Sequence, residues 1–207
     1  MPPRGQLFIV SAPSGSGKTT LVNQVLREIP DLVFSVSFTT RRPRGHESNG
    51  VEYHFVSEEV FERMISEDQF IEHAKVFDCY YGTARTTVDA ARNEGKDLIL
   101  DIDAEGAAQV RSKVPDAVTI FIMPPSYSAL KIRLEQRGED REEIIRKRLN
   151  WARQAEIGRY SDFDFVIVNE DLSHSVTLLK SIIYAERCRT ERLVERIESI
   201  IKTFGGI

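Results

Sequence analysis

Residues 12–19 have the composition and spacing of a phosphate-binding loop. They read APSGSGKT, which fits the pattern G-x-x-x-x-G-K-[ST] except that an alanine takes the place of the first glycine. Gly15 and Gly17 would let backbone N–H groups surround phosphate oxygens at the N-terminus of a helix. The Lys18 cation would reach the terminal phosphates, and the Thr19 hydroxyl would bind Mg²⁺. An ordinary glycine-rich turn is the alternative. The predicted nucleotide-binding residues of this loop are Ala12, Pro13, Ser14, Gly15, Ser16, Gly17, Lys18, Thr19 and Thr20.

Two carboxylates follow the apolar run at residues 98–100. Asp101 and Asp103 are two residues apart, so on one strand they would face the same side. The carboxyl edge of a parallel sheet is where such folds bind ligands, so either carboxylate could face the nucleotide or hold Mg²⁺ through a water molecule. For Asp103 the alternative is a cap on a helix that starts near Ala104.

A second phosphate site is predicted by a basic cluster. Three arginines fall within residues 41–44, and the nearest acid is Glu47. Arginine grips a phosphate through two parallel hydrogen bonds, and the hydroxyls of Tyr53 and Tyr81 could share the anion. A solvated basic loop is the alternative interpretation.

The elements that must position these residues follow an α/β pattern. Short apolar runs at residues 7–10, 98–100, 118–123 and 165–168 alternate with stretches able to form helices. The first such helix follows the glycine-rich loop and has Leu21, Val25 and Leu26 at helical spacing. This order predicts a parallel sheet with helices on its faces.

Two further parts interrupt the predicted core. Residues 35–82 show half-buried strands, such as residues 51–56, and a short helix with Phe61, Met64 and Ile65. This pattern predicts an inserted, mostly antiparallel subdomain. From Ser126, a predicted cap, one helix would reach Arg137 and end at Gly138, and Asp140 with Glu143 has the capping-box spacing for a second helix. This arginine-rich helix pair is predicted to be a mobile lid.

Composition excludes several classes of protein. The 207 residues carry a formal net charge of −4, and 41% of them are hydrophobic, as expected for one compact domain rather than a disordered chain. The acidic balance disfavours a general nucleic-acid binder. Cys79 and Cys188 are too few for a disulfide framework, so we expect a cytoplasmic protein. We also expect no membrane association, because no apolar run is long enough to span a bilayer or form a signal peptide.

The chain resembles the guanylate kinase family of P-loop nucleoside monophosphate kinases. The matching segments run in the family's order: SAPSGSGKTT (11–20), SVSFTTRRPR (35–44), NGVEYHFVS (49–57), FIEHA (70–74), YYGT (80–83), LDIDAEG (100–106) and IVNEDL (167–172). The resemblance implies a single domain, 1–207, with a P-loop kinase core (1–34, 84–125 and 160–207), a GMP-binding subdomain (35–83) and a lid (126–159). It also implies Mg²⁺-dependent, in-line transfer of the γ-phosphoryl group of ATP to GMP, and to dGMP, without a covalent intermediate. The role implied is guanine nucleotide synthesis and recycling, with ATP and GMP as the partners.

The resemblance also assigns residues. Arg41, Arg44, Tyr53 and Tyr81 match the family's clamp on the GMP phosphate, while Ser37, Glu72, Thr83 and Asp101 match its guanine and nucleoside contacts. Guanine presents N1–H and N2–H₂ side by side, and one carboxylate accepts both. Adenine lacks the N2 amino group, so a buried Glu72 would reject it. Without the resemblance, Glu72 would be read as an acid on a strand surface.

In the lid, Arg137 and Arg148 match the arginines that act with Lys18 on the transferring phosphoryl group. Arg133 would assist them on the ATP side. Asn169 matches an adenine-side contact, with a turn-forming role as the alternative.

One pattern lies beyond these motifs. Near the C-terminus, apolar residues recur at helical spacing: Leu193, Val194, Ile197, Ile200, Ile201 and Phe204. They predict either a contact between copies of the chain, making a homo-oligomer, or a face that packs on the chain's own core.

Two rival functions remain at this point. The first is a guanylate-kinase-like binding module without activity, which the intact Lys18, Thr19 and arginine-bearing lid argue against. The second is a P-loop kinase for another small phosphorylated acceptor. Convergence of Ser37, Glu72 and Thr83 on one base would exclude a sugar-phosphate kinase.

Overall fold

The computed structural model describes residues 4–45, 47–76, 78–138 and 141–205. Among these residues, five strands form a sheet in the order β2-β7-β1-β8-β9, and every neighbouring pair is parallel. Its strands are β1 (Leu7–Ser11), β2 (Leu32–Phe34), β7 (Asp97–Asp101), β8 (Val118–Met123) and β9 (Phe165–Val168). The predicted α/β fold with a parallel core sheet is therefore confirmed. The sequence pattern does not predict β2, because three residues are too few to show a period.

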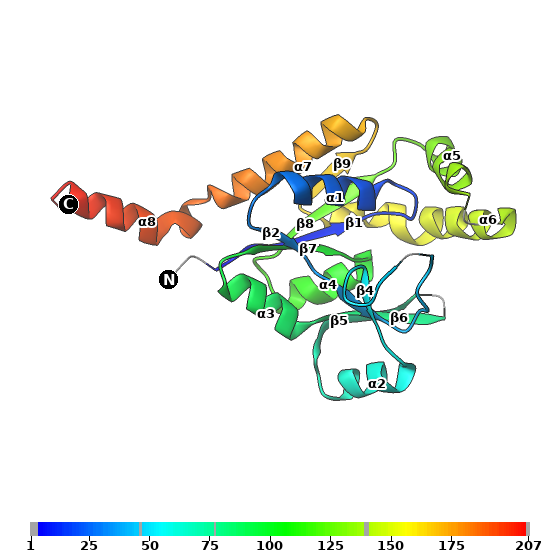
Figure 1. Cartoon of the computed structure of the whole chain (residues 1–207). Helices are drawn as coiled ribbons and strands as arrows, with labels where there is room; N and C mark the ends of the chain where they lie inside the picture. The colour runs from blue at the N-terminus through cyan, green and yellow to red at the C-terminus, as the bar shows by residue number, and fades with distance from the viewer. Residues whose placement is uncertain (1–3, 46, 77, 139–140, 206–207) are drawn as a thin grey trace.

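Helices cover both faces of this sheet (Figure 1). Alternate residues of β1 point to opposite faces, as in any strand. Phe8 and Val10 pack with residues of α1 (Lys18–Glu28) and α7 (Leu172–Arg187), whereas Leu7 and Ile9 pack with residues of α3 (Arg85–Asn93) and α4 (Ala104–Lys113). Burial on both faces explains why the strands read as continuous apolar runs.

A second, mixed sheet carries the residues of the predicted insertion. Its strand order is β4-β3-β6-β5, formed by β3 (Ser37–Thr39), β4 (Tyr53–Phe55), β5 (Phe70–Val76) and β6 (Cys79–Ala84). The β3–β6 and β5–β6 pairs are antiparallel, as predicted, while β3 and β4 are parallel. Helix α2 (Glu58–Ser66) packs against the sheet through Phe61 and Met64, which meet Phe70 of β5.

Two charged helices form a separate layer beside the core sheet (Figure 1). Helix α5 (Tyr127–Arg137) begins at Ser126, whose hydroxyl accepts a hydrogen bond from Ala129 N, and ends at Gly138 in the left-handed region. Helix α6 (Glu142–Trp151) follows, and it has no side-chain cap at Arg141. The predicted Asp140 cap lies outside the described residues. The two helices pack through Leu130, Leu134, Ile145, Leu149 and Ala152.

The chain returns from α6 through two irregular helices. A π-helix, η1 (Ala152–Glu156), leads directly into a 3₁₀-helix, η2 (Ile157–Asp162). The hydrophobic period of the sequence does not reveal either element. π-helices are rare and often mark functional positions.

The C-terminal helix α8 (Thr190–Thr203) projects away from the rest of the chain (Figure 1). None of its described residues is buried, and Phe204, just beyond it, is 81% exposed. The alternative that the C-terminal apolar stripe packs on the chain's own core is therefore wrong. At the start of α8, Arg192 donates hydrogen bonds to the Arg4 carbonyl oxygen and to the Gln6 side chain. Among the described residues, no helix combines the length and hydropathy that crossing a membrane requires.

Candidate active site

The glycine-rich loop connects β1 to α1. Gly15 has φ +92° and Gly17 has φ +88°, a conformation that side chains disfavour. A Cβ atom on Gly17 would also lie 2.6 Å from Asn169 Nδ2. The loop residues Ala12, Pro13 and Ser16 are buried, whereas Ser14, Thr19 and Thr20 are exposed. The strand, loop and helix predicted from the sequence are confirmed.

Two residues far away in sequence hold this loop. The Asn169 side chain, 4% exposed, donates from Nδ2 to the Ser16 carbonyl oxygen at 2.7 Å. Arg133 donates to the same oxygen at 3.2 Å and to the Asn169 carbonyl oxygen at 2.8 Å. Asn169 therefore supports the loop, a role that neither sequence interpretation includes. Because the backbone that bears the loop's N–H groups is fixed, it can receive an anion with little reorganisation.

The helix pair also reaches the loop. Arg148 of α6 donates to the Ser14 hydroxyl at 3.0 Å. Arg137 is the last residue of α5 and is exposed. The predicted phosphoryl-binding arginines are therefore carried by two packed helices beside the loop, and Arg148 already touches it.

Lys18 meets the carboxyl edge of the core sheet. Its ammonium group forms an ion pair with Asp101, and its Nζ lies 3.5 Å from the Ile102 carbonyl oxygen. Asp101 ends β7 directly beside Val10 of β1. Asp103 lies beyond the end of the strand and accepts a hydrogen bond from Gly106 N at 2.7 Å, so it caps α4. The capping alternative for Asp103 is confirmed, and because β7 ends at Asp101 the two carboxylates do not share a strand.

A further acid at this edge, Glu156, is not indicated by the sequence pattern. Glu156 is the last residue of the π-helix and is half-buried. Burial raises the pKa of Glu156 to about 7, while the Lys18 charge works in the opposite direction and the Asp103 charge adds to the rise. A π-helix has no period that a sequence pattern reveals, so only its location beside Lys18 identifies this residue.

Three predicted base contacts meet in the second sheet. Glu72 pairs with Thr83 across β5 and β6. Thr83 hydrogen-bonds to the Glu72 carboxylate, and the Ser37 and Thr83 hydroxyl oxygens are 3.2 Å apart. Glu72 is only 3% exposed, and burial raises its pKa to about 7. The residues present a carboxylate and hydroxyls together, which suits a ligand with adjacent N–H donors and one acceptor.

A glycine in α4 leaves room for that carboxylate. A Cβ atom on Gly106 would lie 2.9 Å from Glu72 Oε2. The start of α4, where backbone N–H groups favour negative charge, therefore comes close to Glu72.

The predicted phosphate clamp forms a second group in this sheet. The Arg41 guanidinium lies 5.3 Å from the centre of the Tyr53 ring, and the Tyr53 and Tyr81 rings meet edge to face at 5.8 Å. Tyr81 also hydrogen-bonds to Arg41. Burial and, as a smaller cause, the charge of Asp101 raise the pKa of Tyr53 to about 12, so its hydroxyl keeps its proton. Asp101 is thus close both to this group and to Lys18.

The fourth predicted clamp residue behaves differently. The Arg44 side chain is exposed, and its backbone N–H donates to Glu47 at 2.7 Å. Glu47 also binds the Arg41 guanidinium. In the sequence, only the position of Glu47 shortly after the basic cluster points to a role for this residue.

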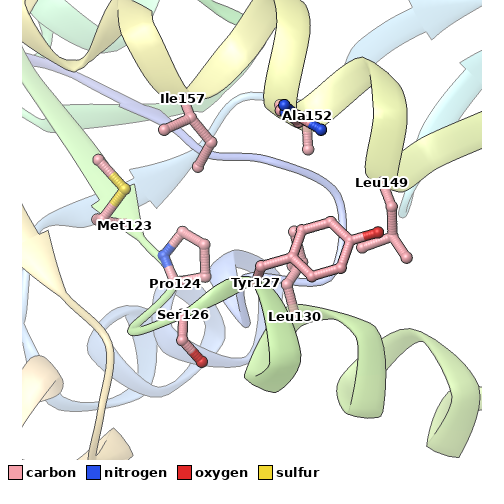
Figure 2. Close-up of a pocket in the computed structure, with 9 residues that line it drawn as sticks. Met123, Pro124, Ser126, Tyr127, Leu130, Leu149, Ala152 and Ile157 are labelled. Atoms are coloured by element: carbon pink, nitrogen blue, oxygen red, sulfur yellow. The ribbon is translucent and has the colours of Figure 1, made fainter.

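A hollow of about 500 Å³ lies where the helix pair joins the core. Figure 2 shows Met123 and Pro124 on one side of it and Ile157 on another, with Tyr127, Leu130 and Leu149 closing the remaining wall. These residues come from α5 and α6 and from the segments that connect the two helices to the core. The predicted site residues do not line this hollow. It adjoins the loop, however, because Leu130 on its wall has its Cδ1 atom 3.2 Å from where a Cβ atom on Gly15 would lie.

Comparison with known proteins places the chain in one family. A family model described as guanylate kinase matches residues 4–186. A guanylate kinase of Syntrophotalea carbinolica is 50% identical over 189 residues, covering 91% of this chain and 90% of that protein. The guanylate kinase of Escherichia coli (strain K12) is 48% identical over 200 residues, covering 96% of each. A crystal structure of guanylate kinase from Anaplasma phagocytophilum has a TM-score of 0.77 and 34% identity, covering 95% of each chain. With matches across nearly its whole length, this chain belongs to the guanylate kinase family.

Proposed function

We propose that this protein transfers the γ-phosphoryl group of ATP to GMP, and to dGMP, giving ADP and the nucleoside diphosphate. The observation that carries the base assignment is the buried Glu72 carboxylate, hydrogen-bonded to Thr83, which in turn lies beside Ser37. The ionised carboxylate accepts from guanine N1–H and N2–H₂ together, and a hydroxyl donates to O6. Adenine would leave the buried carboxylate unpaired, a mismatch worth on the order of 10⁴ in specificity.

On the ATP side, the loop of residues 12–19 surrounds the phosphates with backbone N–H groups. Arg133 and Asn169 keep its backbone in place through the Ser16 carbonyl oxygen. Lys18 exchanges its Asp101 partner for the terminal phosphate oxygens, which frees Asp101 to contact GMP. These groups stabilise charge on the transferring phosphoryl group, so the reaction proceeds in line and needs no covalent intermediate.

On the acceptor side, Arg41, Arg44 and the hydroxyls of Tyr53 and Tyr81 hold the GMP phosphate. Asp101 is close to both substrate sites, because its charge acts on Tyr53 of the clamp and it pairs with Lys18 before ATP binds. The two clamps place the acceptor oxygen and the γ-phosphorus for attack.

The residues at this edge fit Mg²⁺. Among the described residues, no group of three or more acidic, histidine or cysteine side chains is placed to enclose a metal ion. Mg²⁺ needs no such cage, because it keeps several waters and takes phosphate oxygens with one or two protein ligands. The exposed Thr19 hydroxyl would bind it directly, and Asp101 or Asp103 through water. When bound, Mg²⁺ neutralises charge on the β- and γ-phosphates.

We propose that the chain has the three functional parts predicted from its sequence. Residues 1–34, 84–125 and 160–207 belong to the core part, from which α8 projects, residues 35–83 to the GMP-binding part, and residues 126–159 to the lid. Closure of α5 and α6 would bring Arg137 and Arg148 onto the phosphoryl group and exclude water, which otherwise competes with GMP. The hollow at the root of these helices leaves space for that movement.

We also propose that two copies of the chain pair through α8. Val194, Ile197 and Ile200 are each more than a third exposed, with acidic and basic residues alternating beside them. A stripe of this kind is typical of helices that pair with each other. Arg192 fixes the start of α8 on the body of the protein, so the stripe is held in a defined direction.

The thiols of Cys79 and Cys188 are both free, which suits the reducing cytoplasm.

ADP release in a coupled assay with Mg²⁺ tests the reaction. The acceptors are GMP, dGMP, AMP, UMP and none, with Lys18→Ala as the inactive control and Glu72→Ala as the base-pocket variant. We expect turnover with guanine nucleotides only, absent in Lys18→Ala and strongly reduced in Glu72→Ala. Turnover with another acceptor alone would disprove the guanine pocket. No turnover would favour the inactive binding module.

A further inference from the structure

Glu47 joins the two arginines of the proposed GMP phosphate clamp. Its carboxylate accepts hydrogen bonds from both terminal nitrogens of Arg41, each at 2.9 Å, and from the Arg44 backbone N–H at 2.7 Å. Hydrogen bonds from Arg41 hold the pKa of Glu47 below its ordinary value, so the group is ionised at neutral pH. One carboxylate therefore closes the segment from Arg41 to Glu47 into a loop.

The aromatic contacts of Arg41 do not by themselves fix the orientation of its guanidinium. Its side chain is only 11% exposed and lies near the rings of Tyr53 and Phe55. Aromatic faces attract a cation without selecting which N–H groups point in a given direction. The bidentate bond to Glu47, together with the hydrogen bond to the Arg42 carbonyl oxygen, selects that direction. The Glu47 carboxylate also compensates the charge of a largely buried guanidinium.

Arg41 retains donors for a second anion. A guanidinium has five N–H groups. The bonds to Glu47 use two of them, and a bond to the Arg42 carbonyl oxygen at 2.8 Å uses a third. The remaining two N–H groups are enough for Tyr81 and a phosphate oxygen. The phosphate can therefore bind while Glu47 stays in place.

We infer that Glu47 is a positioning residue of the GMP phosphate clamp, acting through Arg41 and the Arg44 backbone. The inference rests on the proposed GMP site. Glu47→Gln keeps the shape of the side chain but turns an amide N–H₂ toward a guanidinium N–H, so one of the two parallel hydrogen bonds is lost. GMP affinity should fall about tenfold, as expected for loss of a charge-assisted hydrogen bond.

Binding of GMP and of guanosine, measured by calorimetry without ATP, separates this role from general loop stability. Guanosine has the base but no phosphate, so its affinity for Glu47→Gln should equal that for the unaltered protein. In turnover, the KM for GMP should rise while kcat changes little, because the clamp holds the phosphate equally before and during transfer. Glu52→Gln is the matched control, since Glu52 accepts from Ser48 N at 2.8 Å in the same loop and is not one of the proposed clamp residues. It should bind GMP normally.

A double-mutant cycle with Arg41→Met shows whether the effect passes through Arg41. Glu47→Gln should weaken GMP binding less than twofold when Arg41 is already Met. If Arg41→Met alone leaves GMP affinity unchanged, the proposed clamp itself is wrong. If Arg41→Met weakens GMP but Glu47→Gln does not, only the inference about Glu47 is wrong.

Two other results would overturn the inference. Tighter GMP binding by Glu47→Gln would mean that Glu47 competes with the phosphate. Equal losses for GMP and guanosine would mean that Glu47 serves only to stabilise the fold. Glu47→Asp keeps the charge on a shorter side chain and should show a smaller, GMP-specific loss; it supplies the same comparison if Glu47→Gln does not fold.

Discussion

The buried carboxyl group of Glu72 should make the protein less stable as the pH rises. Burial raises the pKa of Glu72 to about 7 from an ordinary value of 4.5, so the folded state binds this proton more tightly than the unfolded state. The contribution to the free energy of unfolding is therefore full below pH 4.5 and is lost progressively between pH 4.5 and 7. Glu72→Gln removes the titration and should abolish this part of the pH dependence.

The size of the effect follows from the pKa difference. At 1.36 kcal/mol per unit, the difference between about 7 and 4.5 corresponds to about 3 kcal/mol. Between pH 5 and pH 8, the stability of Glu72→Gln relative to the unaltered protein should therefore increase by about 2.5 kcal/mol. The same change should weaken GMP binding by about a hundredfold, because an amide N–H₂ would face a guanine donor.

Urea unfolding at pH 5, 6, 7 and 8 measures this difference, with GMP binding measured on the same preparations. Glu62→Gln, an exposed change in α2 of the same subdomain, controls for the loss of one negative charge. The comparison uses the change with pH, since replacing a side chain can shift stability equally at every pH. If the two variants show the same pH dependence, Glu72 is not a buried titrating group. Normal GMP binding by Glu72→Gln would disprove the base pocket.

Three further predictions concern separate parts of the protein. Guanosine binding should weaken about tenfold from pH 8 to pH 6 as Glu72 takes up its proton; a flat calorimetric profile would contradict this. Gly17→Ala places a Cβ atom 2.6 Å from Asn169 Nδ2 at φ +88°. It should lower the free energy of unfolding by about 1–3 kcal/mol and raise the KM for ATP. Gly158→Ala, where a Cβ atom meets open space, should change neither quantity. Ile197→Lys should convert a dimer to a monomer in sedimentation, and a monomeric unaltered protein would refute pairing through α8.

The local parts of the site can be predicted from the sequence. A buried strand, two glycines, Lys18 and a helix follow one another within a short segment, so backbone geometry alone determines their arrangement. The core strands are also predictable, because burial on both faces requires continuous apolar runs. The assignment of Glu72 needed the family resemblance, since an acid on a strand has no periodic signal that it is buried.

Other features depended on the tertiary structure. Asn169 reaches the Ser16 carbonyl oxygen across 153 positions, and Ser37 meets Thr83 across 46. Asp101 is drawn to Lys18 because β7 and β1 are neighbours in the sheet, while Asp103, two residues later, caps a helix. The sequence determined which side chains the protein could use for binding. It also determined the local geometry within each strand, loop and helix. The packing of sheets and helices decided which distant side chains meet and left the α8 stripe exposed. These contacts join segments that are far apart in the sequence, so no local periodicity predicts them.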